Sequence, residues 1–170
     1  HSIRLLINRL NWLCAARPDL EFPPLDEPAI LNCLAAAFEG MTLAKQAAAA
    51  NVKPVFRRHM PAAQWEWLDE FAPATIDWPD EQPKRLQYPE VSADKHGNVH
   101  PVELHVNLHE CFRLAEHPTL CEGKHIVRFK LLNPKNKKID FCDDWPTFKQ
   151  REYPRIRKDL LAKFPGVGWV

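Results

Sequence analysis

The chain has 170 residues, of which 45% are apolar and 26% are charged, and its formal net charge is +1. These values indicate a soluble globular chain that is long enough to bury a core. No apolar run reaches the roughly 18 residues needed to cross a bilayer, which excludes a membrane span. The chain begins at His1-Ser2 without a Met, so we expect it to be a piece of a longer protein.

Four helices are predicted in the first 72 residues. Helix start and stop signals place them at about residues 3–17, 26–40, 42–50 and 61–71. The second is the best marked, because Asp26 can cap it, Pro28 fits its first turn and Gly40 follows its end. Helical spacing predicts that this helix buries one face, made of Ile30, Leu31, Leu34 and Phe38.

From residue 73 the pattern changes to short segments with strand periodicity. Five strands are expected: Thr75–Trp78, Lys84–Tyr88, Val102–Val106, His125–Leu132 and Lys138–Cys142. The last two flank a polar turn and should pair as an antiparallel hairpin. The predicted fold class is therefore α+β. A helical N-terminal segment precedes a small, mainly antiparallel five-stranded sheet or partial barrel, and a C-terminal helix follows.

Two further local features are predicted. The loop 92–98 should be exposed, with positive φ near Gly97. In the closing helix, Asp143 or Asp144 can cap the start, and Pro154 should cause a kink or a restart because proline lacks the amide hydrogen.

The catalytic motifs that a nucleotide hydrolase needs are missing from this sequence. Gly123-Lys124 is an isolated dipeptide without the glycine-rich turn of a phosphate-binding loop. The pairs Asp69/Glu70 and Asp143/Asp144 are better explained as helix caps and solvated helix ends than as general acids and bases. We predict no catalytic residue and no cofactor site in this chain.

A metal or disulfide centre is not predicted either. Five cysteines are scattered without a C-x-x-C pair, which favours a reducing cytoplasm and buried thiols. His105, His109 and Cys111 are the nearest approach to a ligand set, but His105 belongs to a strand and His109 to the helix after it. We expect ordinary polar positions there.

The C-terminal third is strongly basic. Residues 124–170 contain 12 Lys or Arg and 5 Asp or Glu, a net of +7, which leaves −6 for residues 1–123. Such cations neutralise phosphates, and exposed aromatic rings can stack on unpaired bases. The candidate nucleic-acid-binding residues are Lys130, Lys135, Lys137, Lys138, Lys149, Arg151, Arg155, Arg157, Lys158 and Lys163.

An equally weighted alternative assigns these residues a structural role. Trp145, Phe148, Tyr153 and Phe164 would fill the core, while the cations form a solvated face or meet the acidic N-terminal part. The spacing of Arg155 and Asp159 also suits an ion pair along the helix, which would leave less charge for RNA.

Several short motifs in the second half resemble the C-terminal region of HrpB-type helicases, which are bacterial members of the DEAH-box group. Ala72–Thr75 looks like the family's "LAPT", and Arg85–Tyr88 like the strand after its "PSG" turn, here replaced by Pro79–Glu81. Val106–Phe112 is similar to "VRLQELFG". Within that motif the chain keeps Glu110 and Phe112, places His109 and Arg113 at the Gln and Gly, and follows with His117-Pro118 at "TP".

The end of the chain continues the resemblance with the same spacing. Leu131–Pro134 looks like "LLSP". The later pattern positions are matched by Asp144, Phe148, Tyr153, Ile156, Lys158, Lys163-Phe164-Pro165 and Trp169. The chain departs from the pattern at Lys137-Lys138, Lys149 and Gly166-Val167, which replace "RP", Trp and "KH".

The resemblance implies a parent protein that is an ATP-dependent RNA helicase of the bacterial cytoplasm, with ATP and Mg²⁺ bound in two RecA-like modules upstream. Residues 1–72 would be a helical linker and residues 73–170 the α+β C-terminal domain. We expect a non-catalytic accessory domain that contacts RNA or single-stranded nucleic acid, or positions the helicase modules. The alternative is a protein-interaction domain without nucleic-acid contact; an independent enzyme would need converging titratable groups that the sequence does not show.

Overall fold

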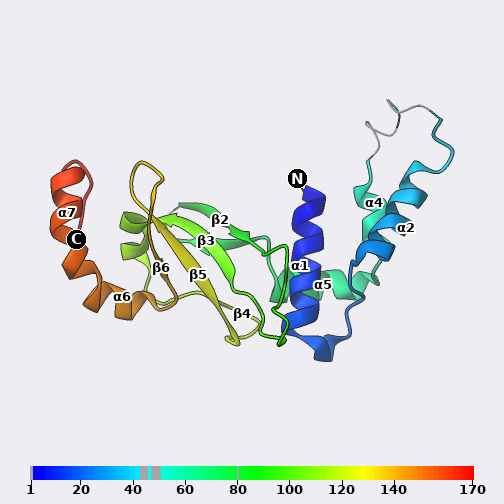
Figure 1. Cartoon of the computed structure of the whole chain (residues 1–170), viewed down its shortest axis with the longest axis horizontal. Helices are drawn as coiled ribbons and strands as arrows, with labels where there is room; N and C mark the ends of the chain where they lie inside the picture. Colours follow the sequence, from blue (N-terminus) through cyan, green and yellow to red (C-terminus); the bar gives the residue numbers. More distant parts are fainter. Residues whose placement is uncertain (1, 43–45, 47–50, 80) are drawn as a thin grey trace. The chain divides into compact units, whose positions relative to one another are not determined.

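The structure is a computed structural model that describes residues 2–42, 46, 51–79 and 81–170 (Figure 1). The chain forms two compact units. The first comprises His1–Pro73 and Glu90–Val99, and the second comprises Ala74–Pro89 and His100–Val170. The connection between two strands of the second unit thus belongs to the first unit.

The first unit is helical, with α1 at Ser2–Ala16, α2 at Glu27–Phe38, α4 at Lys53–Arg57 and α5 at Ala62–Phe71. A short 3-10 turn, η1, occupies Pro18–Leu20. The predicted cap of α2 is confirmed, because the Asp26 carboxylate accepts a hydrogen bond from the backbone N–H of Ala29 at 2.9 Å. The helix expected at 42–50 falls outside the described residues except at Thr42 and Gln46.

Two details of these helices were predicted wrongly or missed. Leu31 was expected in the buried face of α2 but is 57% exposed, and Cys33 is buried instead. Helix α4 was not predicted. Pro54 stands in its first turn, where the missing N–H costs no hydrogen bond.

The core of the first unit includes Leu10, Trp12 and Leu13 of α1 and Leu68 of α5. Arg9 is buried as well, and its guanidinium closes the C-terminal end of α5. It donates to the carbonyl oxygen of Ala72 at 2.7 Å and also pairs with the carboxylate of Asp69. The last carbonyls of a helix have no partner within the helix, so this cation satisfies groups that burial would otherwise penalise.

The loop between strands β2 (Glu81–Gln87) and β3 (Val102–Asn107) carries the predicted turn. Gly97 has a φ of +82°, and Ala93 and Val99 form an isolated antiparallel bridge around it. The Asp94 carboxylate accepts hydrogen bonds from the backbone N–H groups of His96 and Asn98. The residues at the turn are exposed, as the sequence predicts.

The second unit is built on a curled, mixed sheet. Its strands are β1 at Thr75–Trp78, β2 at Glu81–Gln87, β3 at Val102–Asn107, β4 at Thr119–Leu120, β5 at His125–Leu132 and β6 at Lys138–Cys142. Their order is β1-β2-β3-β5-β4, with β6 also paired to β5. Only β3 and β5 are parallel, and the other neighbours are antiparallel. The α+β class and the β5–β6 hairpin are confirmed, and the short β4 makes six strands where five were expected.

One face of this sheet is the core of the second unit. Buried apolar residues alternate along the central strands, including Leu86, Leu104, Val127 and Phe129. A 3-10 helix, η2 at Leu108–Arg113, brings Phe112 against the rings of two later helices. The opposite face of β2, β3, β5 and β6 carries the alternate, mostly polar residues, and we call it the outer face.

Two helices close the second unit, α6 at Trp145–Arg151 and α7 at Tyr153–Lys163. Asp144 caps α6 by accepting from the backbone N–H of Thr147 at 3.0 Å, as one of the two predicted caps. Pro154 lies in the first turn of α7, so the predicted restart at this proline is confirmed. Among the described residues, no helix is both long and apolar enough to cross a membrane.

Candidate nucleic-acid interface

The ten cations singled out from the sequence are accessible. Lys130 is partly exposed and the other nine are exposed. They fall into three sets by position in the fold. Lys130 and Lys138 lie on strands of the outer face, Lys135 and Lys137 lie in the hairpin turn, and the helical set is Lys149, Arg151, Arg155, Arg157, Lys158 and Lys163.

The strand set surrounds an exposed aromatic ring that sequence reasoning missed. Phe141 pairs directly with Lys130 across the hairpin and is 40% exposed. The ammonium of Lys138 lies 4.3 Å from the centroid of the Phe141 ring, and the guanidinium carbon of Arg128 lies 5.9 Å from it. A register shift between Leu131 and Leu132 brings Lys138 to the same face as Phe141.

The hairpin turn is held by one side chain. The Asn133 carboxamide oxygen accepts hydrogen bonds from the backbone N–H groups of Lys135 and Lys137, at 2.9 and 3.1 Å. The backbone of Asn133 also donates to the carbonyl oxygen of Lys137 at 2.9 Å. These bonds fix the backbone that presents the two lysines to solvent.

The helical cations are less suited to acting together. Arg155 pairs with Glu152 at 3.2 Å, not with Asp159 as its spacing suggested. Successive helical residues turn by about 100°, so Arg155 and Arg157 point to nearly opposite sides of α7. One nucleic-acid strand therefore cannot contact all the cations of α7.

The structure joins the hairpin turn to the end of α7. The ammonium of Lys135 lies 6.0 Å from the centroid of the Phe164 ring, directly after α7, and Figure 1 shows the hairpin tip and α7 on the same side of the second unit. Lys163 precedes Phe164 in the chain. The turn and the last residues of α7 thus form one basic end.

The aromatic residues of the C-terminal third are mostly core residues. Trp145, Phe148 and Tyr153 are buried, Phe164 is partly exposed, and Phe141 is exposed. The Phe112 ring makes edge contacts with Trp145 and Tyr153, with centroids 5.2 and 4.7 Å apart. The structural interpretation therefore holds for these three rings, which are unavailable for stacking on bases.

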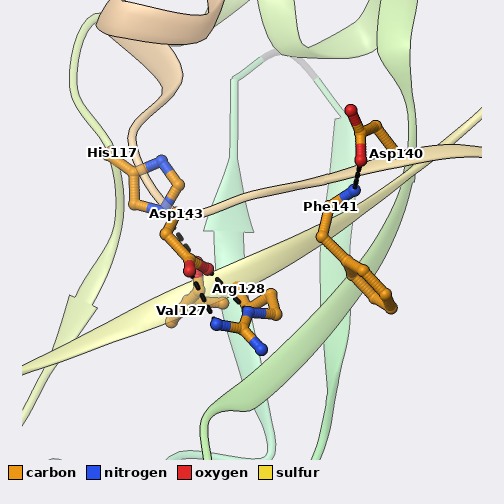
Figure 2. Close-up of polar contacts among 6 residues, drawn as sticks. All are labelled: His117, Val127, Arg128, Asp140, Phe141 and Asp143. Atoms are coloured by element: carbon orange, nitrogen blue, oxygen red, sulfur yellow. Dashed lines mark hydrogen bonds and ion pairs between the residues drawn. The ribbon is translucent and has the colours of Figure 1, made fainter.

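An ion pair and a partly buried imidazole order the base of the hairpin (Figure 2). Arg128 donates to both carboxylate oxygens of Asp143, at 2.8 and 2.7 Å. This pairing lowers the pKa of Asp143 and raises the pKa of Arg128. The Asp143 carboxylate thereby offsets much of the Arg128 charge on the outer face.

His117 is fixed in one neutral tautomer. Its Nε2–H donates to the carbonyl oxygen of Val127 at 2.7 Å, and its Nδ1 accepts from the backbone N–H of Trp145 at 3.0 Å. Burial lowers the pKa of His117, although the nearby Asp143 and Asp144 carboxylates oppose that shift. His117 thus ties β5 to the first turn of α6.

Neither the possible metal ligands nor the Gly123-Lys124 dipeptide forms a recognisable site in the described residues. Within the described part of the chain, no group of three or more His, Cys, Asp or Glu side chains could hold a metal ion. His105 bonds to Glu103 on β3, whereas the His109 ring packs edge-on to Trp169. Gly123-Lys124 lies in a turn before β5, so no helix N-terminus follows it to receive a phosphate.

Comparison with known proteins identifies the family of the chain. A family model described as "ATP-dependent helicase C-terminal", HrpB_C, matches residues 33–170. The chain belongs to the HrpB C-terminal family. It is 23% identical over 167 residues to the ATP-dependent RNA helicase HrpB of Escherichia coli strain K12, covering 95% of this chain and 20% of that protein.

Two solved structures share the HrpB C-terminal fold. A crystal structure of the E. coli DExH-box NTPase HrpB has a TM-score of 0.81 and 21% identity, covering 97% of this chain and 20% of that one. A crystal structure of the E. coli DEAH/RHA helicase HrpB has a TM-score of 0.67 and 22% identity. The match covers 95% of this chain and 20% of that one. The chain therefore spans about a fifth of the length of these relatives.

The residues that carry the HrpB resemblance are mainly structural. Glu110 accepts a hydrogen bond from the Lys84 ammonium at 2.8 Å, and both side chains are largely buried. Phe112 and Tyr153 pack against each other, and the indole N–H of Trp169 donates to the carbonyl oxygen of Phe164 at 3.0 Å. These matched positions stabilise the fold, so they do not by themselves locate a binding site.

Strand register could have indicated part of what the sequence analysis missed, namely Arg128 but not Phe141. Arg128 and Lys130 alternate with buried Val127 and Phe129, which predicts that both cations share the outer face. Whether Phe141 joins them depends on how β6 pairs with β5. That pairing includes a register shift, which no local pattern in Lys138–Cys142 announces.

Proposed function

We propose that this chain is a non-catalytic accessory domain of an ATP-dependent RNA helicase, and that the β5–β6 hairpin contacts the RNA backbone. The observation that carries the proposal is the exposure of Lys135 and Lys137, on a turn fixed by Asn133, and of Lys138 at the start of β6. Each exposed lysine can neutralise a phosphate and release a counterion. The pairing of Arg128 with Asp143 and of Arg155 with Glu152 leaves these lysines as the favoured contacts.

The proposed partners follow from the family. The E. coli relative is an ATP-dependent RNA helicase, and this chain covers only 20% of it. In our proposal, ATP and Mg²⁺ bind to RecA-like modules that precede this domain in the same protein. Residues 1–72 act as a helical linker to those modules, and residues 73–170 form the domain itself. The proposed location is the bacterial cytoplasm.

A second candidate is a protein-interaction domain that docks on the helicase modules, or on another partner, without contacting RNA. The exposed apolar side chains of Ile126 and Leu161 favour it, with 50% and 38% exposure. The buried Trp145, Phe148 and Tyr153 count against it, because these large rings are not available to a docking partner.

Electrophoretic mobility shifts of the 170-residue chain with single-stranded RNA across a salt series separate the two candidates. If lysines contact phosphates, the logarithm of the binding constant should fall linearly with the logarithm of the salt concentration. The slope is about −0.7 for each contacted phosphate of a single strand. Three lysine contacts thus predict a slope near −2. An absence of binding at low salt would contradict RNA contact and favour the docking role.

A further inference from the structure

We propose that Phe141 on the outer face stacks on an unpaired base, so that the RNA bound by this domain is single-stranded. This inference rests on the proposed function, which supplies RNA as the ligand. It adds the part of the nucleotide that is recognised and the residue that recognises it. Lysines in the hairpin turn can contact phosphates of either single or double strands, whereas a ring needs an exposed base face.

Phe141 presents its ring to solvent. In a strand, successive side chains point to opposite faces, and Cys142 is buried in the core while its neighbour Phe141 is 40% exposed. Figure 2 shows the Asp140 carboxylate turned back onto the backbone N–H of Phe141, while the ring points the other way. The ring therefore faces solvent on the outer face.

Positively charged side chains lie close to Phe141. Lys130 lies directly opposite it, and the Lys138 ammonium lies 4.3 Å from the ring centroid. The next cation, Arg128, is shared with Asp143, and His105 is paired in register with Lys130 and bonds to Glu103. Lys130 and Lys138, which make no ion pair with the acidic side chains that the structure describes, thus lie beside and over one exposed ring, which suits a ligand with an aromatic base and an adjoining phosphate.

The rest of the outer face is accessible on the strands next to β6. Ile126 lies on the same face of β5 and is 50% exposed, so this part of the face is open to solvent in the described second unit. Gln87 and Glu103, paired in register on β2 and β3, extend the face, and the Glu103 carboxylate lies beside Arg128 in the register of β3 and β5. A sheet with an exposed ring on its edge strand β6 and lysines beside it suits a single strand laid across it.

Fluorescence anisotropy with the 170-residue chain tests the inference, using a labelled RNA single strand, a blunt RNA duplex of equal length, and a strand carrying abasic residues. We expect the wild-type chain to prefer the single strand. Phe141→Ala should weaken single-strand binding about five- to 150-fold, the range seen when a stacking ring is removed. On the abasic strand, where no base can stack, the same substitution should have no effect.

Three further variants keep the result interpretable. Phe141→Tyr retains a ring and should bind like wild type. Phe141→Leu retains apolar volume without a ring and should weaken binding even if Phe141→Ala fails to fold. Leu161→Ala removes an equally exposed apolar side chain from α7 and should leave affinity unchanged.

Two outcomes would overturn the inference, and they differ in what else they contradict. If Phe141→Ala and Phe141→Leu bind the single strand as tightly as wild type, while reversal of the hairpin lysines still weakens binding, stacking is wrong and backbone contact stands. If the wild-type chain binds neither the single strand nor the duplex at low salt, the proposed function fails and the inference fails with it.

Discussion

Arg128 on β5 and Asp143 after β6 form a two-bond ion pair across the base of the hairpin, with N–O distances of 2.8 and 2.7 Å. The pair links the two strands, and it also places a negative charge among the cations of the outer face. Both side chains are more than a third exposed, so solvent and salt screen their attraction. We therefore expect the pair to support stability and to weaken binding of a nucleic acid.

Replacing Asp143 with Asn separates these two effects. The loss of the ion pair should lower the free energy of unfolding by less than about 1 kcal/mol, because exposed pairs contribute little. The release of Arg128 should strengthen single-stranded RNA binding by up to about fivefold, since one repulsive charge near the phosphates is removed. Urea unfolding and fluorescence anisotropy measure the two quantities. Weaker RNA binding by a folded Asp143→Asn variant would show that Arg128 does not face the ligand.

His117 predicts a pH dependence of stability. Burial lowers its pKa below the ordinary 6.5, so between those two values the unfolded chain binds more protons than the folded chain. The stabilisation by neutral His117 is complete above about pH 6.5, and it is lost as the pH falls toward the lowered pKa. Asp143 and Asp144 also have lowered pKa values, but the stability that they contribute is lost only below about pH 5, under the interval over which thermal unfolding follows His117.

Thermal unfolding between pH 7.5 and pH 5 checks this dependence. The melting temperature of the wild-type chain should fall over this interval. His117→Asn keeps an acceptor for the Trp145 N–H but cannot titrate there, so its melting temperature should vary less with pH. His96→Asn, in the exposed turn of the first unit, is the matched control and should behave like wild type. Equal pH dependence of His117→Asn and wild type would contradict the role of His117.

Arg9 should be the cation with the larger effect on stability in the first unit. Arg9→Met keeps the apolar stem but removes the donors to Ala72 and Asp69, which should cost about 2 to 3 kcal/mol because these are charged hydrogen bonds at a buried helix end. Arg4→Met removes an exposed pair with Glu90 and should cost less than about 1 kcal/mol. Urea unfolding followed by far-UV circular dichroism measures both. Equal losses would show that Arg9 does not hold the end of α5.

The strands that sequence patterns predicted best are those with a clear period. His125–Leu132 alternates over its full length, and both of its ends match β5. Thr119–Leu120 was missed, because two residues cannot display a period. The parallel pairing of β3 with β5 joins segments separated by η2 and β4, and no local pattern encodes such a pairing.

The candidate site was predictable in its charge but not in its aromatic part. Lysine and arginine are rarely buried, so the exposure of the ten cations followed from residue type. Aromatic residues occur both in cores and at binding surfaces, and only packing decides between them. Phe112 of η2 buries Trp145 and Tyr153, whereas Phe141 is left exposed by the pairing of β6.

The most direct measurement is the salt dependence of single-stranded RNA binding by a triple variant with Lys135→Glu, Lys137→Glu and Lys138→Glu. The control reverses three exposed cations of the first unit, Lys53, Arg58 and Lys95, which changes the net charge equally. We predict that the hairpin variant binds far more weakly and that its salt slope is shallower by about 2, while the control retains most of its affinity. Equal losses in the two variants, or a hairpin variant that binds like wild type, would contradict contact between the hairpin and the RNA backbone.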